Sequence, residues 1–173
     1  HVVFGEDIAI LTGDALLNYA FETACLAFDK DPENSWKIGQ ALKILGKKAG
    51  IYGMIGGQVI DVKETGHAVS KEVLDQIYEL KTGALIECAM LIGAILGGAP
   101  EEELPVVEKI ASYIGIAFQI QDDILDVTST AEVLGKPIHS DEKNEKTTYV
   151  TLKGLEESVK IVEKLSAESI RLL

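Results

Sequence analysis

The pattern of hydrophobic and polar residues is helical along almost the whole chain. Apolar residues recur at the three- and four-residue spacing of an amphipathic helix, and no alternating stretch is long enough to predict a β-strand. The predicted helices span about residues 6–29, 33–64, 70–98, 101–128 and 154–173, with loops or short helices at about 129–153. The sequence therefore predicts an all-α fold.

Length and charge narrow the classes of function. The 173 residues suit a single domain, and both ends are expected to be cut from something longer, because the chain lacks an initial methionine and closes within a helical pattern. The formal net charge of −12 argues against a nucleic-acid surface, since phosphate contacts need clustered lysines and arginines. An anionic substrate would need metal ions or well-placed lysines to overcome the negative electrostatic potential of such a chain.

The cysteines and the most apolar run indicate the cellular compartment of the protein. Cys25 and Cys88 lie in apolar stretches without metal-ligand spacing, so both are predicted to be small buried side chains in a reducing compartment. The most apolar run, residues 83–99, contains Glu87 and is rich in glycine, which predicts a core helix and no membrane span. No signal-peptide pattern is found, and a cytoplasmic location is expected.

One helix face gathers acidic residues. Gln119, Asp122, Asp123 and Asp126 fall within roughly 100° of arc on one side of the predicted helix 101–128. Asp122 and Asp126 are one turn apart and are positioned to share a hard cation such as magnesium, which takes oxygen ligands. The same spacing also fits an ordinary solvated polar face, and spacing alone leaves both interpretations open.

A lysine interrupts the apolar stripe of the third predicted helix. Lys81 falls at the centre of the stripe and is followed by Thr82. A buried ammonium must meet an anion or lose its proton, so this position predicts an anionic partner. The alternative is a lysine whose ammonium reaches solvent from a seam between helices.

Two further segments contribute polar groups. Gln58 and Asp61 project together from a mostly apolar, glycine-rich helix, which fits either a ligand site or a satisfied buried polar pair. Lys136, Asp141 and Lys146 follow the acidic helix in a segment that reads as an exposed loop by composition. Next to the aspartates, its lysines could also hold a metal-bound diphosphate.

Five segments in order, GQVID, KTGALIE, GIAFQIQDDILD, GK and DEKNEKTTY, resemble the trans-isoprenyl diphosphate synthases, or polyprenyl synthetases. The resemblance covers essentially all 173 residues and is greatest to the bacterial farnesyl diphosphate synthases. It implies an incomplete helical bundle of the isoprenoid synthase type. It also implies a magnesium-dependent prenyltransferase that joins an allylic diphosphate to isopentenyl diphosphate and forms a homodimer.

The resemblance also implies roles for individual residues. The catalytic residues would be Lys81, Thr82 and Lys136. The substrate-binding residues would be these three with Gln58, Phe118, Gln119 and Lys146. The magnesium-binding residues would be Asp122, Asp123, Asp126 and Asp141, with Asp61 as a further acid of the cavity. Lys81 would then meet the allylic diphosphate, which is the anion that its position in the stripe requires.

The family's first aspartate-rich motif has no counterpart in the 173 residues, so the isolated chain is expected to be inactive. The expected product is farnesyl diphosphate, with geranylgeranyl diphosphate as the alternative. Other interpretations are a non-catalytic or regulatory synthase subunit, a terpene cyclase of the same fold, and an acidic helical module that binds cations without substrate.

Overall fold

Helices make up the regular secondary structure, as the sequence predicts. The computed structural model describes residues 1–130 and 146–173, and this part of the chain contains no β-strand. The chain divides into two compact units, His1–Lys43 and Ile44–Leu173. That residues 1–173 form one domain stays a prediction.

The first unit consists mainly of one long helix. α1 (Glu6–Lys30) is followed by the 3-10 turn η1 (Pro32–Asn34) and by the start of α2 (Ser35–Ala49). No residue of α1 is buried, and Cys25 on this helix is exposed. The prediction of buried cysteines is therefore wrong for Cys25, because α1 buries none of its side chains, and is confirmed for Cys88.

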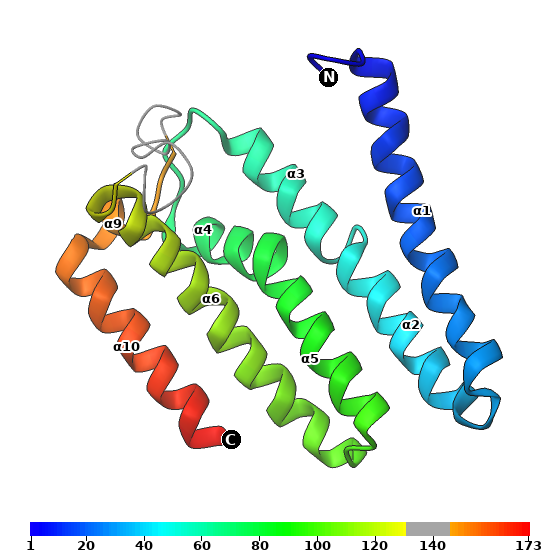
Figure 1. The fold of residues 1–173 in the computed structure, drawn as a ribbon. Coiled ribbons are helices and arrows are strands. Elements are labelled where there is room, and N and C mark those ends of the chain that lie inside the picture. Colours follow the sequence, from blue (N-terminus) through cyan, green and yellow to red (C-terminus); the bar gives the residue numbers. More distant parts are fainter. Residues whose placement is uncertain (131–145) are drawn as a thin grey trace. The chain divides into compact units, whose positions relative to one another are not determined.

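The second unit is a bundle of helices built around α6. After the end of α2 it contains α3 (Met54–Glu64), α4 (Lys71–Tyr78), the π-helical turn η2 (Glu79–Gly83), α5 (Ala84–Gly97), the 3-10 turn η3 (Glu101–Glu103), α6 (Leu104–Thr128), α9 (Tyr149–Lys153) and α10 (Leu155–Leu172). In Figure 1, α6 lies between α5 and α10, and it packs against both.

The single helix predicted for residues 33–64 is wrong, because the chain breaks between α2 and α3. Residues 50–53 form a bend and turns, and Gly53 has φ −140° and ψ −123°, far from helical values. A Cβ atom at Gly53 would lie 2.0 Å from the carbonyl oxygen of Lys48, so a larger residue would not fit this turn. Glycine also disfavours the helix interior by about 1 kcal/mol relative to alanine.

The largest apolar core joins α4, α6 and α9. Its buried members are Leu74, Ile77, Tyr78, Ile120, Ile124 and Tyr149. Ile120 has no exposed surface, and burying a side chain of this size stabilises the fold by about 1.5–3 kcal/mol. Leu74, Ile77 and Tyr78 of this core also line the pocket described below, so the core supports one of its walls.

One helix of the described residues, Lys71–Gly97, is long and apolar enough by composition to cross a membrane. Core helices of soluble proteins have the same property, so this is weak evidence. In this structure residues 71–97 are made up of α4, η2 and α5, which follow one another directly and pack along α6.

Candidate functional site

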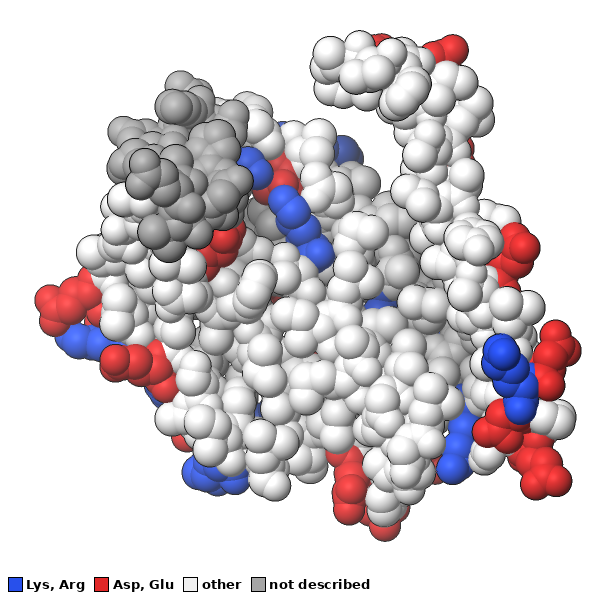
Figure 2. Space-filling view, in the orientation of Figure 1, with Lys and Arg blue, Asp and Glu red and all other residues white. Residues whose placement is uncertain are grey.

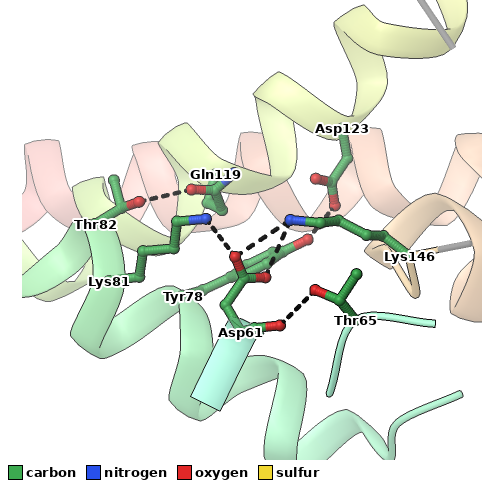
Figure 3. A network of polar contacts seen from close by, with 8 residues as sticks. All are labelled: Asp61, Thr65, Tyr78, Lys81, Thr82, Gln119, Asp123 and Lys146. Atoms are coloured by element: carbon green, nitrogen blue, oxygen red, sulfur yellow. Dashed lines mark hydrogen bonds and ion pairs between the residues drawn. The ribbon is translucent and has the colours of Figure 1, made fainter. Parts of the chain in front are cut away.

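A polar pocket of about 140 Å³ opens in the second unit between α3, the α4–η2 segment, α6 and the residues that precede α9. It is lined by Asp61 from α3, Lys81 from η2, Gln119 from α6 and Lys146 from just before α9 (Figure 3). Asp122 of α6 also belongs to its lining. Residues far apart in the sequence thus meet at one place.

One carboxylate binds both lysines of the pocket. Lys81 donates to Oδ2 of Asp61 at 2.6 Å, and Lys146 donates to both carboxylate oxygens at 3.2 Å (Figure 3). Burial raises the pKa of Asp61, but the hydrogen bonds and charges of the two lysines outweigh it, so the pKa lies below its ordinary value. Asp61 is therefore ionised and holds two ammonium groups at the pocket.

Carboxylates outnumber lysines around the pocket. Its lining includes four acids, Asp61, Glu64, Asp122 and Asp123, and two lysines, Lys81 and Lys146. The face drawn in Figure 2 is largely uncharged, and its basic and acidic side chains lie beside one another in several places. An anion that enters this pocket therefore needs cations beyond the two lysines.

Lys81 and Thr82 lie on a π-helical turn, a rare widening of a helix that is often found at functional sites. Glycines on two neighbouring helices make room for it. A Cβ atom at Gly57 of α3 would lie 2.3 Å from the backbone nitrogen of Lys81, and one at Gly115 of α6 would lie 2.7 Å from the Cα of Gly83. The turn that aims Lys81 at the pocket is thus enclosed by close backbone contacts.

Thr82 orients the glutamine of the pocket. Its hydroxyl donates to Oε1 of Gln119 at 2.7 Å, and Gln119 lines the pocket (Figure 3). Because the carboxamide oxygen accepts this hydrogen bond, the amide nitrogen of Gln119 faces the other way and is the group that can donate to a ligand.

The three aspartates of the acidic helix have different surroundings. Asp122 is half-buried and lines the pocket. Asp123 is 4% exposed, and its Oδ2 accepts hydrogen bonds from the hydroxyl of Tyr78 at 2.6 Å and the backbone nitrogen of Tyr149 at 2.9 Å. Asp126 is 3% exposed and is not among the residues that line the pocket.

The pocket brings together six of the residues chosen from the sequence: Asp61, Lys81, Gln119, Asp122, Asp123 and Lys146. Thr82 adjoins it through Gln119. Gln58 and Phe118 are exposed and, like Asp126, are absent from its lining. Lys136 and Asp141 lie outside the described residues.

Sequence reasoning missed the two tyrosines that hold Asp123. Tyr78 and Tyr149 are both buried, with ring centroids 5.7 Å apart. Burial, followed by the hydrogen bond to Asp75, raises the pKa of Tyr149 to about 12. The available signal was the position of Tyr78 three residues before Lys81, which puts both on neighbouring parts of one helix face.

The described residues contain no group of three His, Cys, Asp or Glu side chains close enough to hold a metal ion by themselves. Magnesium, however, commonly uses one or two carboxylates, with the remaining ligands supplied by water and substrate phosphates. Asp122 at the pocket, with carboxylates in excess over lysines, fits an ion held in that way.

A sequence profile described as polyprenyl synthetase matches residues 1–170. The chain belongs to the polyprenyl synthetase family. Its relatives include a heterodimeric geranylgeranyl pyrophosphate synthase large subunit of Arabidopsis thaliana, 41% identical over 172 residues, which are 98% of this chain and 46% of the relative. The farnesyl diphosphate synthase of Geobacillus stearothermophilus is 39% identical over 155 residues, 90% of this chain and 52% of that protein.

Solved structures agree with the family assignment. A Helicobacter pylori geranyltransferase, complexed with magnesium and isoprenyl diphosphate, matches with a TM-score of 0.85 and 34% identity. The match covers 98% of this chain and 54% of that one, so this polyprenyl synthetase chain spans about half the length of its relatives. The predicted family and the all-α fold of the isoprenoid synthase type are confirmed.

Proposed function

We propose that the protein containing this chain is a prenyltransferase that condenses an allylic diphosphate with isopentenyl diphosphate. The observation that carries the proposal is the meeting of Lys81, Lys146 and Asp122 at one pocket. The family supports it, since the relatives are named as farnesyl and geranylgeranyl diphosphate synthases.

In this proposal the two lysines bind the diphosphate of the allylic substrate. Asp61 keeps their ammonium groups at the pocket, and the amide nitrogen of Gln119 adds a neutral donor. Magnesium, held in part by Asp122, would supply further positive charge to the leaving diphosphate. Fixed positive charge of this kind stabilises the diphosphate as its carbon–oxygen bond breaks.

The rest of the reaction takes place on the substrates. The carbon–oxygen bond of the allylic diphosphate breaks, and the allylic carbon bonds to the terminal alkene carbon of isopentenyl diphosphate. A proton is then lost to the released diphosphate, which gives the longer allylic diphosphate. Apolar residues next to the pocket, including Leu74 and Ile77, would limit the access of water to the cation.

The product is proposed to be a short-chain prenyl diphosphate. Geranylgeranyl diphosphate synthases are among the relatives at 41–44% identity, and the farnesyl diphosphate synthase is at 39%, so the family alone does not favour the farnesyl product expected from the sequence. A homodimer and a cytoplasmic location stay predictions.

The test uses the full-length protein that contains this chain. It would be incubated with magnesium, geranyl diphosphate and radiolabelled isopentenyl diphosphate, and the labelled products would be separated by chain length. Label in a farnesyl or geranylgeranyl product is expected. Lys81→Ala should reduce turnover by about 100-fold or more, since it removes a charge that faces the leaving group.

If the folded full-length protein incorporates no label from isopentenyl diphosphate into a longer prenyl diphosphate, the proposal is contradicted. Retention of magnesium-dependent diphosphate binding without turnover would instead favour the non-catalytic subunit. Release of a hydrocarbon from geranyl diphosphate without isopentenyl diphosphate would favour the terpene cyclase.

A further inference from the structure

Asp123 connects three elements of the second unit from a buried position on α6. Its Oδ2 atom accepts the hydroxyl of Tyr78, at the end of α4 (Figure 3), and the backbone N–H of Tyr149, the first residue of α9. Burial away from water strengthens hydrogen bonds of this kind. Both donors would be left buried and without this partner if the carboxylate were removed.

Other contacts at the start of α9 involve its own segment and the ring of Tyr149. Thr148 caps it and forms a reciprocal capping box with Thr151, but these bonds are internal to the segment. The ring of Tyr149 packs beside Tyr78, and its hydroxyl donates to Asp75. Among these contacts, the hydrogen bond from the Tyr149 N–H to Asp123 is the one that joins the backbone of this turn to the acidic helix.

Lys146 lies three residues before Tyr149 and reaches the pocket from the same short segment. Its ammonium group is 3.2 Å from both carboxylate oxygens of Asp61, on α3. Thr147 adds a second attachment, since its hydroxyl accepts the backbone N–H of Val69 at 3.1 Å. Both attachments, Thr147 to Val69 and Tyr149 to Asp123, follow Lys146 within three residues and hold the segment from which its ammonium group reaches the pocket.

We propose that Asp123 is a positioning residue: it fixes the backbone at the start of α9 and thereby holds the ammonium group of Lys146 in the pocket. Both Asp122 and Asp123 line the pocket, but Asp123 is the more buried of the two and acts on the diphosphate through Lys146. The inference rests on the proposed function only in that Lys146 binds a diphosphate.

The test compares Asp123→Ala and Asp123→Asn in the full-length protein. Hydrogen exchange of the peptide covering residues 146–153 reports on the segment, and calorimetry with inorganic diphosphate and magnesium reports on the pocket. Asp123→Ala should speed exchange and weaken binding, each about tenfold. Asp123→Asn should lie closer to the wild type than Asp123→Ala in both measurements, because a carboxamide oxygen can accept the same two hydrogen bonds.

A double-mutant cycle connects the effect to Lys146. Adding Asp123→Ala to Lys146→Ala should cause no further loss of diphosphate affinity, because both changes remove the same contact. Asp122→Asn is the matched control on the same helix: it should weaken magnesium-dependent binding and leave exchange of residues 146–153 unchanged. If Asp123→Ala fails to fold, Tyr78→Phe, which removes one of the two bonds, should give a smaller change in the same direction.

Two results would overturn the inference. One is unchanged exchange in Asp123→Ala. The other is a loss of diphosphate binding in Asp123→Asn that equals that of Asp123→Ala and is reversed by added magnesium, as expected of a metal ligand. If the wild-type protein does not bind diphosphate, the proposed function fails, and the exchange data still decide whether Asp123 holds α9.

Discussion

Replacement of Gly57 by alanine tests whether close packing of α3 holds the π-helical turn. The added Cβ atom would lie 2.3 Å from the nitrogen of Lys81 and 2.7 Å from the carbonyl carbon of Leu80, whereas ordinary contact begins at 3.4 Å. The two segments must therefore separate by about 1 Å, because backbone atoms cannot rotate aside. Overpacking of this kind costs about 3 kcal/mol at the upper end, and alanine regains about 1 kcal/mol of helix propensity.

We therefore expect Gly57→Ala to lower the free energy of unfolding by about 2 kcal/mol, measured by urea denaturation. A displacement of about 1 Å at Lys81 should also reduce turnover, by up to about 100-fold. Gly93→Ala is the matched control, since a Cβ atom there meets nothing within 4 Å. Equal stability and equal turnover in the two variants would refute the reasoning.

Three other predictions follow from the same residues. Because the pKa of Asp61 is lowered, its ion pairs should stabilise the protein fully above its ordinary pKa of 3.8 and lose this effect as pH falls through the lower native value. The difference in free energy of unfolding between wild type and Asp61→Asn, measured with urea, should therefore shrink as the pH is lowered through this range. Tyr149, with its pKa of about 12, favours the folded protein below pH 10 and loses this contribution as pH rises through 12; a tyrosine absorbance titration should show a transition near 12 that Tyr149→Phe removes. The isolated 173 residues should not incorporate labelled isopentenyl diphosphate, because they lack the family's first aspartate-rich motif. Turnover by this chain alone would contradict the expectation that this motif is required.

The helical periodicity was enough to predict the class of the fold and most of its helices, because helices of the second unit such as α4, α5 and α6 bury an apolar stripe. It also placed Lys81 in an apolar stripe, where an ammonium needs an anion or a route to solvent; in this structure its side chain is 34% exposed and pairs with Asp61. The break at residues 50–53 was missed because the apolar spacing continues through it, while the decisive fact is a backbone conformation.

The detailed site depended on packing that periodicity does not encode. Asp122 and Asp126 share a helix face by spacing, yet the first lines the pocket and the second is buried outside its lining. The π-helical turn arises where Gly57 and Gly115 allow neighbouring backbones to approach, which is a tertiary effect. Likewise, nothing local to Tyr149 shows that its N–H meets a carboxylate 26 positions earlier.

The π-helical turn between α4 and α5 limits how this part of the chain can change in length. Loss of one residue from Glu79–Gly83 would allow a regular α-helix from Lys71 to Gly97, with local hydrogen bonding at least as good. The π-helical turn takes up one extra residue within about a single turn, so the deletion would leave α5 nearly in phase with α4 and still able to pack on α6. It would, however, remove the widened turn that carries Lys81 and Thr82, so a deletion that repairs the helix would keep the packing and disturb the pocket.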